Sequence, residues 1–291
     1  MKIERVGILH PGAMGTSVAA TVQNGGYEVW WVPEGRSRAT RDRAREHGFR
    51  PAQSLGDLAA SCHVLLSVCP PASAGDVASA VVDAGFRGLF VDANAISPRR
   101  VQVMGERLGQ AGVDFVDGGI LGLPAPEPGM TRIYLSGPRS GEVAGLFAAG
   151  PVGAVCLEGE VGRASALKMC YAGYTKGTRA LLWAVLATAE SLGVRSDLEG
   201  HWEYESPGAA GEAHRKVLAT TPKAWRWVAE MEEIAATFAG VGMPGGFHAA
   251  CGEVLEKLVD FKDAGVALRI DDVLETLLSR RGETRPARPV E

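Results

Sequence analysis

The sequence lacks the features that mark several broad classes of protein. It has only five cysteines among 291 residues, and they are scattered without the spacing of a metal site. We interpret them as reduced thiols, which is typical of a cytoplasmic protein. The most hydrophobic helical stretch, ALLWAVLATA, has about half the length that is needed to cross a bilayer. The hydrophobic run at the N-terminus is short and soon meets charged residues and glycines, so a signal peptide is not expected.

The chain also lacks an excess of positive charge. Its 30 Lys and Arg residues against 34 Asp and Glu residues give a formal net charge of −4, so a nucleic-acid partner is not expected. It shows no internal repeat. Hydrophobic residues make up 46% and charged residues 22%, which predicts a globular protein long enough for two domains. Residues 281–291 carry two prolines and many charges, and we predict that they form a flexible tail.

The first half of the chain alternates between strand and helix patterns. Short hydrophobic runs predict strands at 5–9, 25–32, 63–68, 88–93, 113–119, 131–137 and 153–159. Helical patterns lie between them at 12–24, 38–48, 74–84 and 98–110. This alternation predicts right-handed crossovers and a mostly parallel, doubly wound α/β sheet of the Rossmann type over residues 1–160.

Strand patterns are absent after about residue 162. A proline-free helical segment covers 164–194, and further helical patterns follow at 208–219, 223–239 and 247–263. Residues 161–280 are therefore expected to form an all-α C-terminal domain. Because so long a helix needs surfaces to pack on, we expect it to join the two domains and to take part in a subunit interface. Glu203, Tyr204 and Glu205 are predicted to lie in a loop.

A turn between the first strand and the first helix approximates the dinucleotide-binding pattern G-x-G-x-x-G, but its first glycine is missing. The second glycine lets the backbone approach a pyrophosphate, and the third lets the helix pack on the strand. Gly12 and Gly15 fill these two positions, while His10 stands at the first. The predicted cofactor contacts in this turn are His10, Pro11, Gly12, Ala13, Met14 and Gly15. The alternative is a plain strand–helix turn.

The end of the second predicted strand bears on the choice of nucleotide. Glu34 lies about twenty residues after the glycines, where an acidic residue binds the ribose of NAD. Arg36 and Ser37 follow at once, and a guanidinium beside a hydroxyl can bind a 2′-phosphate. We therefore predict NADP(H) in preference to NAD(H). The alternative is that Glu34 binds the ribose of NAD and the arginines lie on a solvated helix.

Four stretches, GILHPGAMG, FVDANAISP, FVDGGILG and GRASALKMCYAGYTKG, occur in the order and spacing of one known group of enzymes. In them the chain resembles the β-hydroxyacid dehydrogenase superfamily, which includes 6-phosphogluconate and 3-hydroxyisobutyrate dehydrogenases and has imine reductases as relatives. The resemblance is closest to 6-phosphogluconate dehydrogenase-like proteins with a distinct C-terminal domain. It covers most of residues 1–180 and implies a homodimeric dehydrogenase that uses a nicotinamide cofactor.

The resemblance also implies a catalytic lysine on the long helix, which matches Lys168 in this chain. In such enzymes this lysine exchanges a proton with the substrate oxygen, and desolvation beside the nicotinamide lowers its pKa toward neutrality. Tyr171 and Thr175 lie within two helical turns of Lys168 and are predicted to share the proton transfer. The alternative is that Lys168 is an ordinary solvated helix lysine.

The chain departs from the family pattern where the substrate is expected. Ala172 replaces an asparagine, Leu121 a serine, and Asn94 and Ala95 a serine–threonine pair. Losing these polar groups predicts a larger or less polar substrate than 6-phosphogluconate. The predicted substrate contacts are Gly119, Leu121, Gly122 and His248, and Cys69, Pro70 and Asn94 complete the predicted cofactor set, with Asn94 beside the nicotinamide ribose. No metal ligands are predicted.

Together these features predict an NADP(H)-dependent oxidoreductase that acts on a small carbonyl or alcohol substrate similar to a β-hydroxyacid. Two alternatives stay open. An imine carries its own basic nitrogen and needs less from the protein, so an imine reductase fits the lost asparagine. A dinucleotide-binding sensor without turnover fits the loss of both polar residues.

Overall fold

A computed structural model of the chain describes residues 2–124, 127–262, 264 and 268–279. The described residues form two compact units, 2–171 with 236–243, and 172–235 with those from 244 onward. The division falls within a long helix, and the boundary expected at residues 160 and 161 stays a prediction. The tail predicted at residues 281–291 lies outside the described residues.

The first unit is built on one sheet, as predicted. Within the described residues the strand order is β3-β2-β1-β4-β5-β6-β7-β8, and every neighbouring pair is parallel except β6 and β7. The strands are β1 (Arg5–Ile8), β2 (Glu28–Trp31), β3 (Arg50–Pro51), β4 (Val64–Ser67), β5 (Leu89–Asp92), β6 (Asp114–Gly122), β7 (Thr131–Ser136) and β8 (Val152–Cys156). The doubly wound sheet is therefore confirmed, with one antiparallel step.

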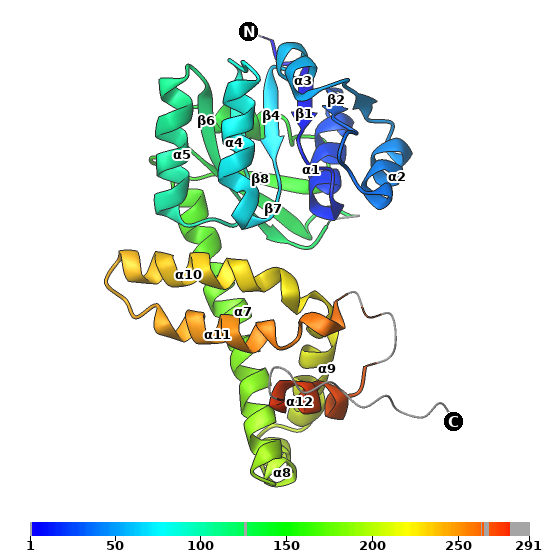
Figure 1. Cartoon of the computed structure of the whole chain (residues 1–291), viewed down its shortest axis with the longest axis vertical. Helices are drawn as coiled ribbons and strands as arrows, with labels where there is room; N and C mark the ends of the chain where they lie inside the picture. Colours follow the sequence, from blue (N-terminus) through cyan, green and yellow to red (C-terminus); the bar gives the residue numbers. More distant parts are fainter. Residues whose placement is uncertain (1, 125–126, 263, 265–267, 280–291) are drawn as a thin grey trace. The chain divides into compact units, whose positions relative to one another are not determined.

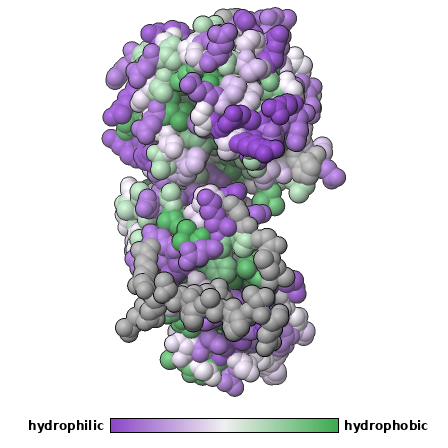
Figure 2. Space-filling view, turned by 45° about the vertical axis from the view of Figure 1, so that its right-hand side comes forward, coloured by the Kyte–Doolittle hydropathy of each residue, from purple (hydrophilic) through white to green (hydrophobic). Residues whose placement is uncertain are grey.

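Helices cover both faces of this sheet (Figure 1). They are α1 (Ala13–Asn24), α2 (Arg38–Glu46), α3 (Leu55–Ser61), α4 (Ala74–Asp83), α5 (Pro98–Gln110) and α6 (Ser140–Gly145). Alternate strand residues point to opposite faces, so Val64 and Leu66 pack with α1 and α6, whereas Leu65 packs with α3, α4 and α5. Burial on both faces explains the continuous hydrophobic runs in the sequence. The outer surface is mostly hydrophilic, with smaller hydrophobic areas (Figure 2).

The short helix α3 was not predicted, although the sequence carries a signal for it. The Ser54 hydroxyl accepts a hydrogen bond from the Asp57 amide at 3.1 Å, and the Asp57 carboxylate accepts one from the Gln53 amide at 3.0 Å. The first bond is that of a capping box with Ser54 as the N-cap, whereas the second reaches the amide one residue before the N-cap. Both bonds satisfy amides that have no partner within the helix. The spacing Ser-x-x-Asp is visible in the sequence.

The second unit is helical in its described residues, as predicted. Its elements are α7 (Arg163–Ser191), which begins in the first unit, α8 (Arg195–Glu205), α9 (Ala209–Thr220), a 3₁₀ helix (Thr221–Trp227), α10 (Val228–Gly240), which ends in the first unit, α11 (Gly246–Glu256), a short 3₁₀ helix (Val259–Phe261) and α12 (Ile270–Leu278). The helix predicted at 223–239 thus starts as a 3₁₀ helix and becomes α-helical at Val228. No described helix is both long enough and hydrophobic enough to span a bilayer.

The loop predicted for Glu203, Tyr204 and Glu205 is wrong, because all three residues lie in α8. None of the residues of α8 is buried, so the helix has no hydrophobic face that could show as a periodic pattern. The Glu203 carboxylate also accepts hydrogen bonds from the amides of Gly208 at 2.7 Å and Ala210 at 3.2 Å. Glu203 therefore connects the end of α8 to the start of α9.

Candidate functional site

The turn from β1 into α1 is closed by backbone hydrogen bonds despite its missing first glycine. The Gly12 amide donates to the His10 carbonyl at 2.8 Å, and the Thr16 amide donates to the Gly12 carbonyl at 2.8 Å. The Thr16 hydroxyl donates to the carbonyl of Pro11 at 3.0 Å. The turn is therefore held by main-chain atoms, which a histidine supplies as well as a glycine does.

The two remaining glycines of the turn have different surroundings. A Cβ atom added to Gly15 would lie 2.1 Å from the carbonyl oxygen of His10, far closer than contact allows. A Cβ atom added to Gly12 would meet no atom within 4 Å. Gly15 is therefore required for the packing of α1 on the turn, whereas Gly12 leaves open space in which a ligand can approach the backbone.

A pocket of about 280 Å³ opens beside this turn. It lies at the carboxyl ends of the adjacent parallel strands β2, β1 and β4, where open α/β sheets bind their ligands. It is lined by His10, Gly12, Gly35, Arg36, Ser37, Thr40, Val68, Cys69 and Pro70. Six of these residues were predicted as cofactor contacts. The predicted contact Glu34 is exposed and not part of the lining.

Two buried nitrogen atoms in this pocket have no hydrogen-bond partner among the described residues, His10 Nδ1 and Arg36 Nε. Burial, together with the positive charge of Arg36, lowers the pKa of His10 to about 4, so its imidazole is neutral at pH 7. Burial also lowers the pKa of Arg36, although a guanidinium keeps its charge at neutral pH. The pocket therefore holds a half-buried cation whose Nε has no partner among the described residues, which suits an anionic ligand.

The Ser37 hydroxyl forms hydrogen bonds within its own segment. Its hydroxyl accepts a hydrogen bond from the Thr40 amide at 3.3 Å and lies 3.1 Å from the Thr40 hydroxyl, so it caps the start of α2. Ser37 is exposed and also lines the pocket. The N-terminus of α2 thus adds partial positive charge beside Arg36.

Asn94 lies behind the pocket wall rather than at its surface. Its Nδ2 donates to Ser67 Oγ at 3.0 Å and to Asp92 Oδ1 at 2.5 Å, and its Oδ1 accepts from the Cys69 amide at 2.6 Å. Burial raises the pKa of the Asp92 carboxyl to about 7, although hydrogen bonds from Asn94 oppose this. Burial also raises the pKa of the Cys69 thiol to about 11, so it is protonated at neutral pH. Asn94 therefore positions the loop that carries Cys69.

Lys168 lies in the second turn of α7 and is half-buried. Its Nζ donates a hydrogen bond to the carbonyl oxygen of Ile120 in β6 at 2.8 Å. The close approach of α7 to β6 depends on a glycine, because a Cβ atom on Gly119 would lie 2.6 Å from the Ala164 carbonyl oxygen. The predicted substrate contact Gly119 therefore has a packing role as well.

A buried carboxylate that sequence reasoning missed holds the start of α7. Asp117 Oδ2 accepts hydrogen bonds from the Gly162 amide at 2.9 Å, the Ser165 amide at 3.0 Å and the Ser136 hydroxyl at 2.9 Å. Its Oδ1 accepts from the Ser165 hydroxyl at 2.6 Å. Asp117 thus acts as the N-terminal cap of the helix that carries Lys168. The partners are distant in sequence, so no local pattern announces this role.

The remaining predicted residues are divided between the two units. Leu121, Gly122 and Tyr171 belong to the first unit, and Thr175 and His248 to the second. His248 is buried, its Nε2 lies 3.3 Å from the Gly173 carbonyl oxygen, and burial lowers its pKa. Their assembly into one substrate site stays a prediction. Among the described residues, no group of three or more His, Cys, Asp or Glu side chains could hold a metal ion.

Comparison with protein families gives a match in each half of the chain. Residues 5–138 match the NAD binding domain of 6-phosphogluconate dehydrogenase. Residues 189–258 match DUF1932, a domain of unknown function. The first match contains the glycine turn and the whole lining of the 280 Å³ pocket.

Known proteins resemble the chain over most of its length. The solved structure of the conserved protein MTH1747 of unknown function, described as similar to 3-hydroxyacid dehydrogenases, is 32% identical with a TM-score of 0.66, covering 88% of this chain and 97% of that one. An uncharacterized 28.5 kDa protein in the 7S RNA 5′ region of Methanothermus fervidus is 29% identical over 171 residues, or 59% of this chain. The chain spans 65% of that relative's length, slightly less than two thirds.

Two enzymes share the fold at lower identity. The 3-hydroxyisobutyrate dehydrogenase of Mycobacterium tuberculosis, solved with L-serine, is 16% identical with a TM-score of 0.66, covering 96% of this chain and all of that one. The reductive aminase of Aspergillus terreus, solved with NADPH and ethyl levulinate, is 18% identical with a TM-score of 0.56, covering 94% and 99%. These similarities extend the shared fold through both units.

Proposed function

The chain belongs to the family that joins an NAD-binding domain of 6-phosphogluconate dehydrogenase to a DUF1932 domain, and we propose that within it this protein is an NADP(H)-dependent oxidoreductase. The proposed reaction moves a hydride between the nicotinamide and the carbonyl carbon of a small substrate similar to a β-hydroxyacid. The observation that carries the proposal is the pocket beside β1, where the half-buried Arg36 has a buried Nε without a partner among the described residues, next to an open glycine backbone.

The residues present fit a dinucleotide phosphate. The open backbone at Gly12 and the N-terminus of α1 suit the pyrophosphate, with the amides of Ala13, Met14 and Gly15 as donors. Arg36 supplies a guanidinium and Ser37 a hydroxyl for a 2′-phosphate, which NADP carries and NAD lacks. His10 adds a neutral donor or acceptor in the same pocket. When bound, the cofactor would supply the hydride.

Lys168 is the proposed proton donor in the reducing direction. The carbonyl of Ile120 accepts a hydrogen bond from its Nζ at 2.8 Å, which positions the ammonium beside β6. Asp117 holds the first turn of the helix that carries it. Tyr171 and Thr175 are proposed to share the proton transfer, and Gly119, Leu121, Gly122 and His248 to border the substrate.

The proposal is tested by binding and by turnover. Titration of the purified protein with NADPH and NADH should give saturable binding with a preference for NADPH. Arg36→Gln should reduce that preference by about tenfold or more, because hydrogen bonds to a charged phosphate are lost. Arg38→Gln is the matched control, since the Arg38 side chain is 95% exposed beside Asp42. Equal affinity of the wild type for both nucleotides contradicts the NADP assignment.

A panel of β-keto acids, aldehydes and cyclic imines then separates the candidate activities by the loss of NADPH absorbance. Ala172, in place of a family asparagine, is fully buried and offers no hydrogen bond, which favours an imine as the second candidate substrate. Lys168→Ala should lower kcat on a carbonyl by about 10²- to 10⁴-fold and leave NADPH affinity unchanged. NADPH binding without turnover across the panel would favour a dinucleotide sensor and contradict the oxidoreductase.

We also propose that the protein is a homodimer. Its chain mass is 30.6 kDa, so light scattering after size exclusion distinguishes the two states by a doubled mass. A mass that stays at one chain across micromolar concentrations contradicts the dimer.

A further inference from the structure

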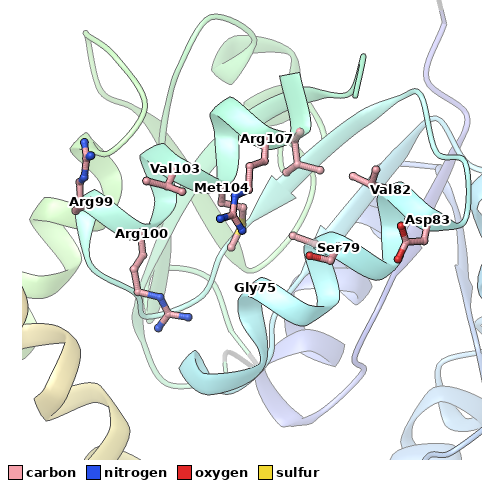
Figure 3. A pocket seen from close by; sticks show the side chains of 11 residues that line it. Gly75, Ser79, Val82, Asp83, Arg99, Arg100, Val103, Met104 and Arg107 are labelled. Carbon is pink, nitrogen blue, oxygen red and sulfur yellow. The ribbon is translucent and has the colours of Figure 1, made fainter. Parts of the chain in front are cut away.

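A larger cavity lies elsewhere on the first unit, between α4 and α5. Its volume is about 420 Å³, and it shares no lining residue with the pocket at the strand ends. Cavities of about 300–1,000 Å³ are the size of small-molecule sites. We call it the α4–α5 groove (Figure 3). None of the residues proposed for cofactor or substrate binding lines it.

The sequence of α4 explains why the groove is hollow. The residues that α4 turns toward α5 are Gly75, Ala78, Ser79 and Val82, which recur at helical spacing and are small for most of its length. α5 faces them with Val103 and Met104. Small side chains on one helix leave a space that the longer side chains of the other do not fill.

The floor of the groove is apolar. Ala78, Met104 and Leu108 are buried, and all three belong to the hydrophobic core on this face of the sheet. Val82 packs against the same core and is partly exposed. An apolar floor beneath an open groove favours a ligand with a hydrocarbon or aromatic body.

The rim of the groove is cationic along α5. Arg107 extends across the groove toward Ser79 of α4, and Arg100 extends toward the start of α4 (Figure 3), where it donates to the Pro71 carbonyl at 3.3 Å. Arg107 forms no ion pair with any residue that the structure describes. Asp83 lies at the other end of α4 and disfavours an anion there. The guanidinium of Arg107 and the hydroxyl of Ser79 thus provide polar groups at the rim of the groove, above its apolar floor.

From this combination we propose that the α4–α5 groove is a binding site for a small amphipathic carboxylate, with its anionic head on Arg107 and Ser79 and its apolar body on Met104 and Val82. A guanidinium binds a carboxylate through charge-assisted hydrogen bonds, and a serine hydroxyl donates one more. The inference does not depend on the proposed oxidoreductase activity, because the groove is separate from the cofactor pocket.

Calorimetric titration of the full-length protein with decanoate tests the charge requirement. Decanoate should bind saturably, whereas decanol and decylamine should bind at least about tenfold more weakly, because they lack the charge-assisted bond. Arg107→Gln should weaken decanoate binding by about tenfold or more. Arg38→Gln is the matched control, since the exposed Arg38 lies on α2 and does not line the groove, and it should change the affinity less than about twofold.

A second measurement places the ligand. Ser79→Leu fills the groove at an exposed position of α4, and it should abolish binding while thermal unfolding confirms that the variant folds. In protein with ¹³C-labelled methionine methyl groups, decanoate should shift the Met104 signal, which Met104→Leu identifies. Saturating NADPH should leave decanoate affinity unchanged.

Four results would overturn the assignment. The first is no saturable decanoate binding up to about 10 mM, where an interaction is weaker than about 3 kcal/mol. The second is an equal loss of affinity in the Arg107 and Arg38 variants, and the third is displacement of decanoate by NADPH. The fourth is a dimer that dissociates in Ser79→Leu without any decanoate binding to the wild type. The last result would make the groove a surface between two copies of the chain.

Discussion

At the scale of single residues, the glycine turn shows how one backbone can tolerate a change at one position and forbid it at another. His10 contributes its carbonyl oxygen to the turn, and it is this oxygen that Gly15 approaches. The imidazole of His10 projects into the pocket lining, where burial keeps it neutral. The missing first glycine therefore changes the chemistry of the pocket and leaves the shape of the turn intact.

The two glycines of the turn should respond oppositely to alanine. Gly15→Ala places a methyl group against the His10 carbonyl and should lower the free energy of unfolding by about 1–3 kcal/mol or more, measured by urea denaturation. Gly12→Ala meets no protein atom, so its stability should stay within about 1 kcal/mol of the wild type while NADPH affinity falls by about tenfold or more. NADPH affinity at the wild-type level in Gly12→Ala would contradict the placement of the pyrophosphate.

The free energy of unfolding should depend on pH through the carboxyl of Asp92. The pKa of its carboxyl is about 7 in the folded protein and 3.8 in its ordinary environment. Between these values the folded state keeps a proton that the unfolded state has lost, so the contribution of Asp92 to stability falls as pH rises from about 4 to 7. The slope is at most about 1.4 kcal/mol per pH unit.

Asp92→Asn tests this by removing the titration. Subtracting the unfolding free energy of the variant from that of the wild type at each pH should give a difference that declines from pH 4 to 7 and is level above about pH 8. A difference that stays constant across this range would show that the carboxyl titrates normally. The chemical shift of the carboxyl carbon should follow the same midpoint.

At the scale of secondary-structure elements, hydrophobic pattern predicted most of the first unit because its central strands are buried on both faces. β4 and β5 are buried along their whole length and appear in the sequence as unbroken runs. α8 could not be predicted in this way, because a helix without a buried residue shows no hydrophobic periodicity. β3 has two residues and is defined only by its pairing with β2, which no local pattern specifies.

The junction of β6 with α7 provides the prediction at this scale. The side chain of Asn in Asp117→Asn has one acceptor oxygen for the four donors that the carboxylate binds, and its NH₂ group would face some of those donors. The free energy of unfolding should therefore fall by about 2–4 kcal/mol. Asp114→Asn, three residues earlier in β6, is the matched control, because its exposed pair with Arg139 should contribute less than about 1 kcal/mol. Urea denaturation measures both, and equal effects would contradict the capping role of Asp117.

At the scale of the whole molecule, the structure brings several of the residues predicted for the cofactor together in one pocket, whereas it divides those predicted for catalysis and substrate binding between the two units. His10, Gly12, Arg36 and Ser37 lie in two short segments whose order along a Rossmann fold places them together. Asp117 could not be found in this way, because the amides it binds are 45 and 48 residues away. The predicted catalytic and substrate residues belong to both units, and Thr175 and His248 have no local motif that joins them to Leu121.

The whole chain should be stabilised by the nucleotide it binds. At 100 times its dissociation constant, NADPH should add about 2.7 kcal/mol to the free energy of unfolding, because it binds the folded state alone. For a chain of this size that corresponds to a rise in Tm of about 5 °C or more. Scanning calorimetry should show a smaller rise with NADH at the same concentration. An unchanged Tm at millimolar NADPH would remove the basis for the proposed chemistry.

The hydrogen bond between the Gly12 amide and the carbonyl at position 10 has a consequence for which amino acids this turn can accept. Any amino acid offers that oxygen, so codon randomisation at position 10 should yield many folded variants. The same experiment at position 15 should return glycine almost alone. The turn can thus accept changes at position 10 while position 15 stays fixed.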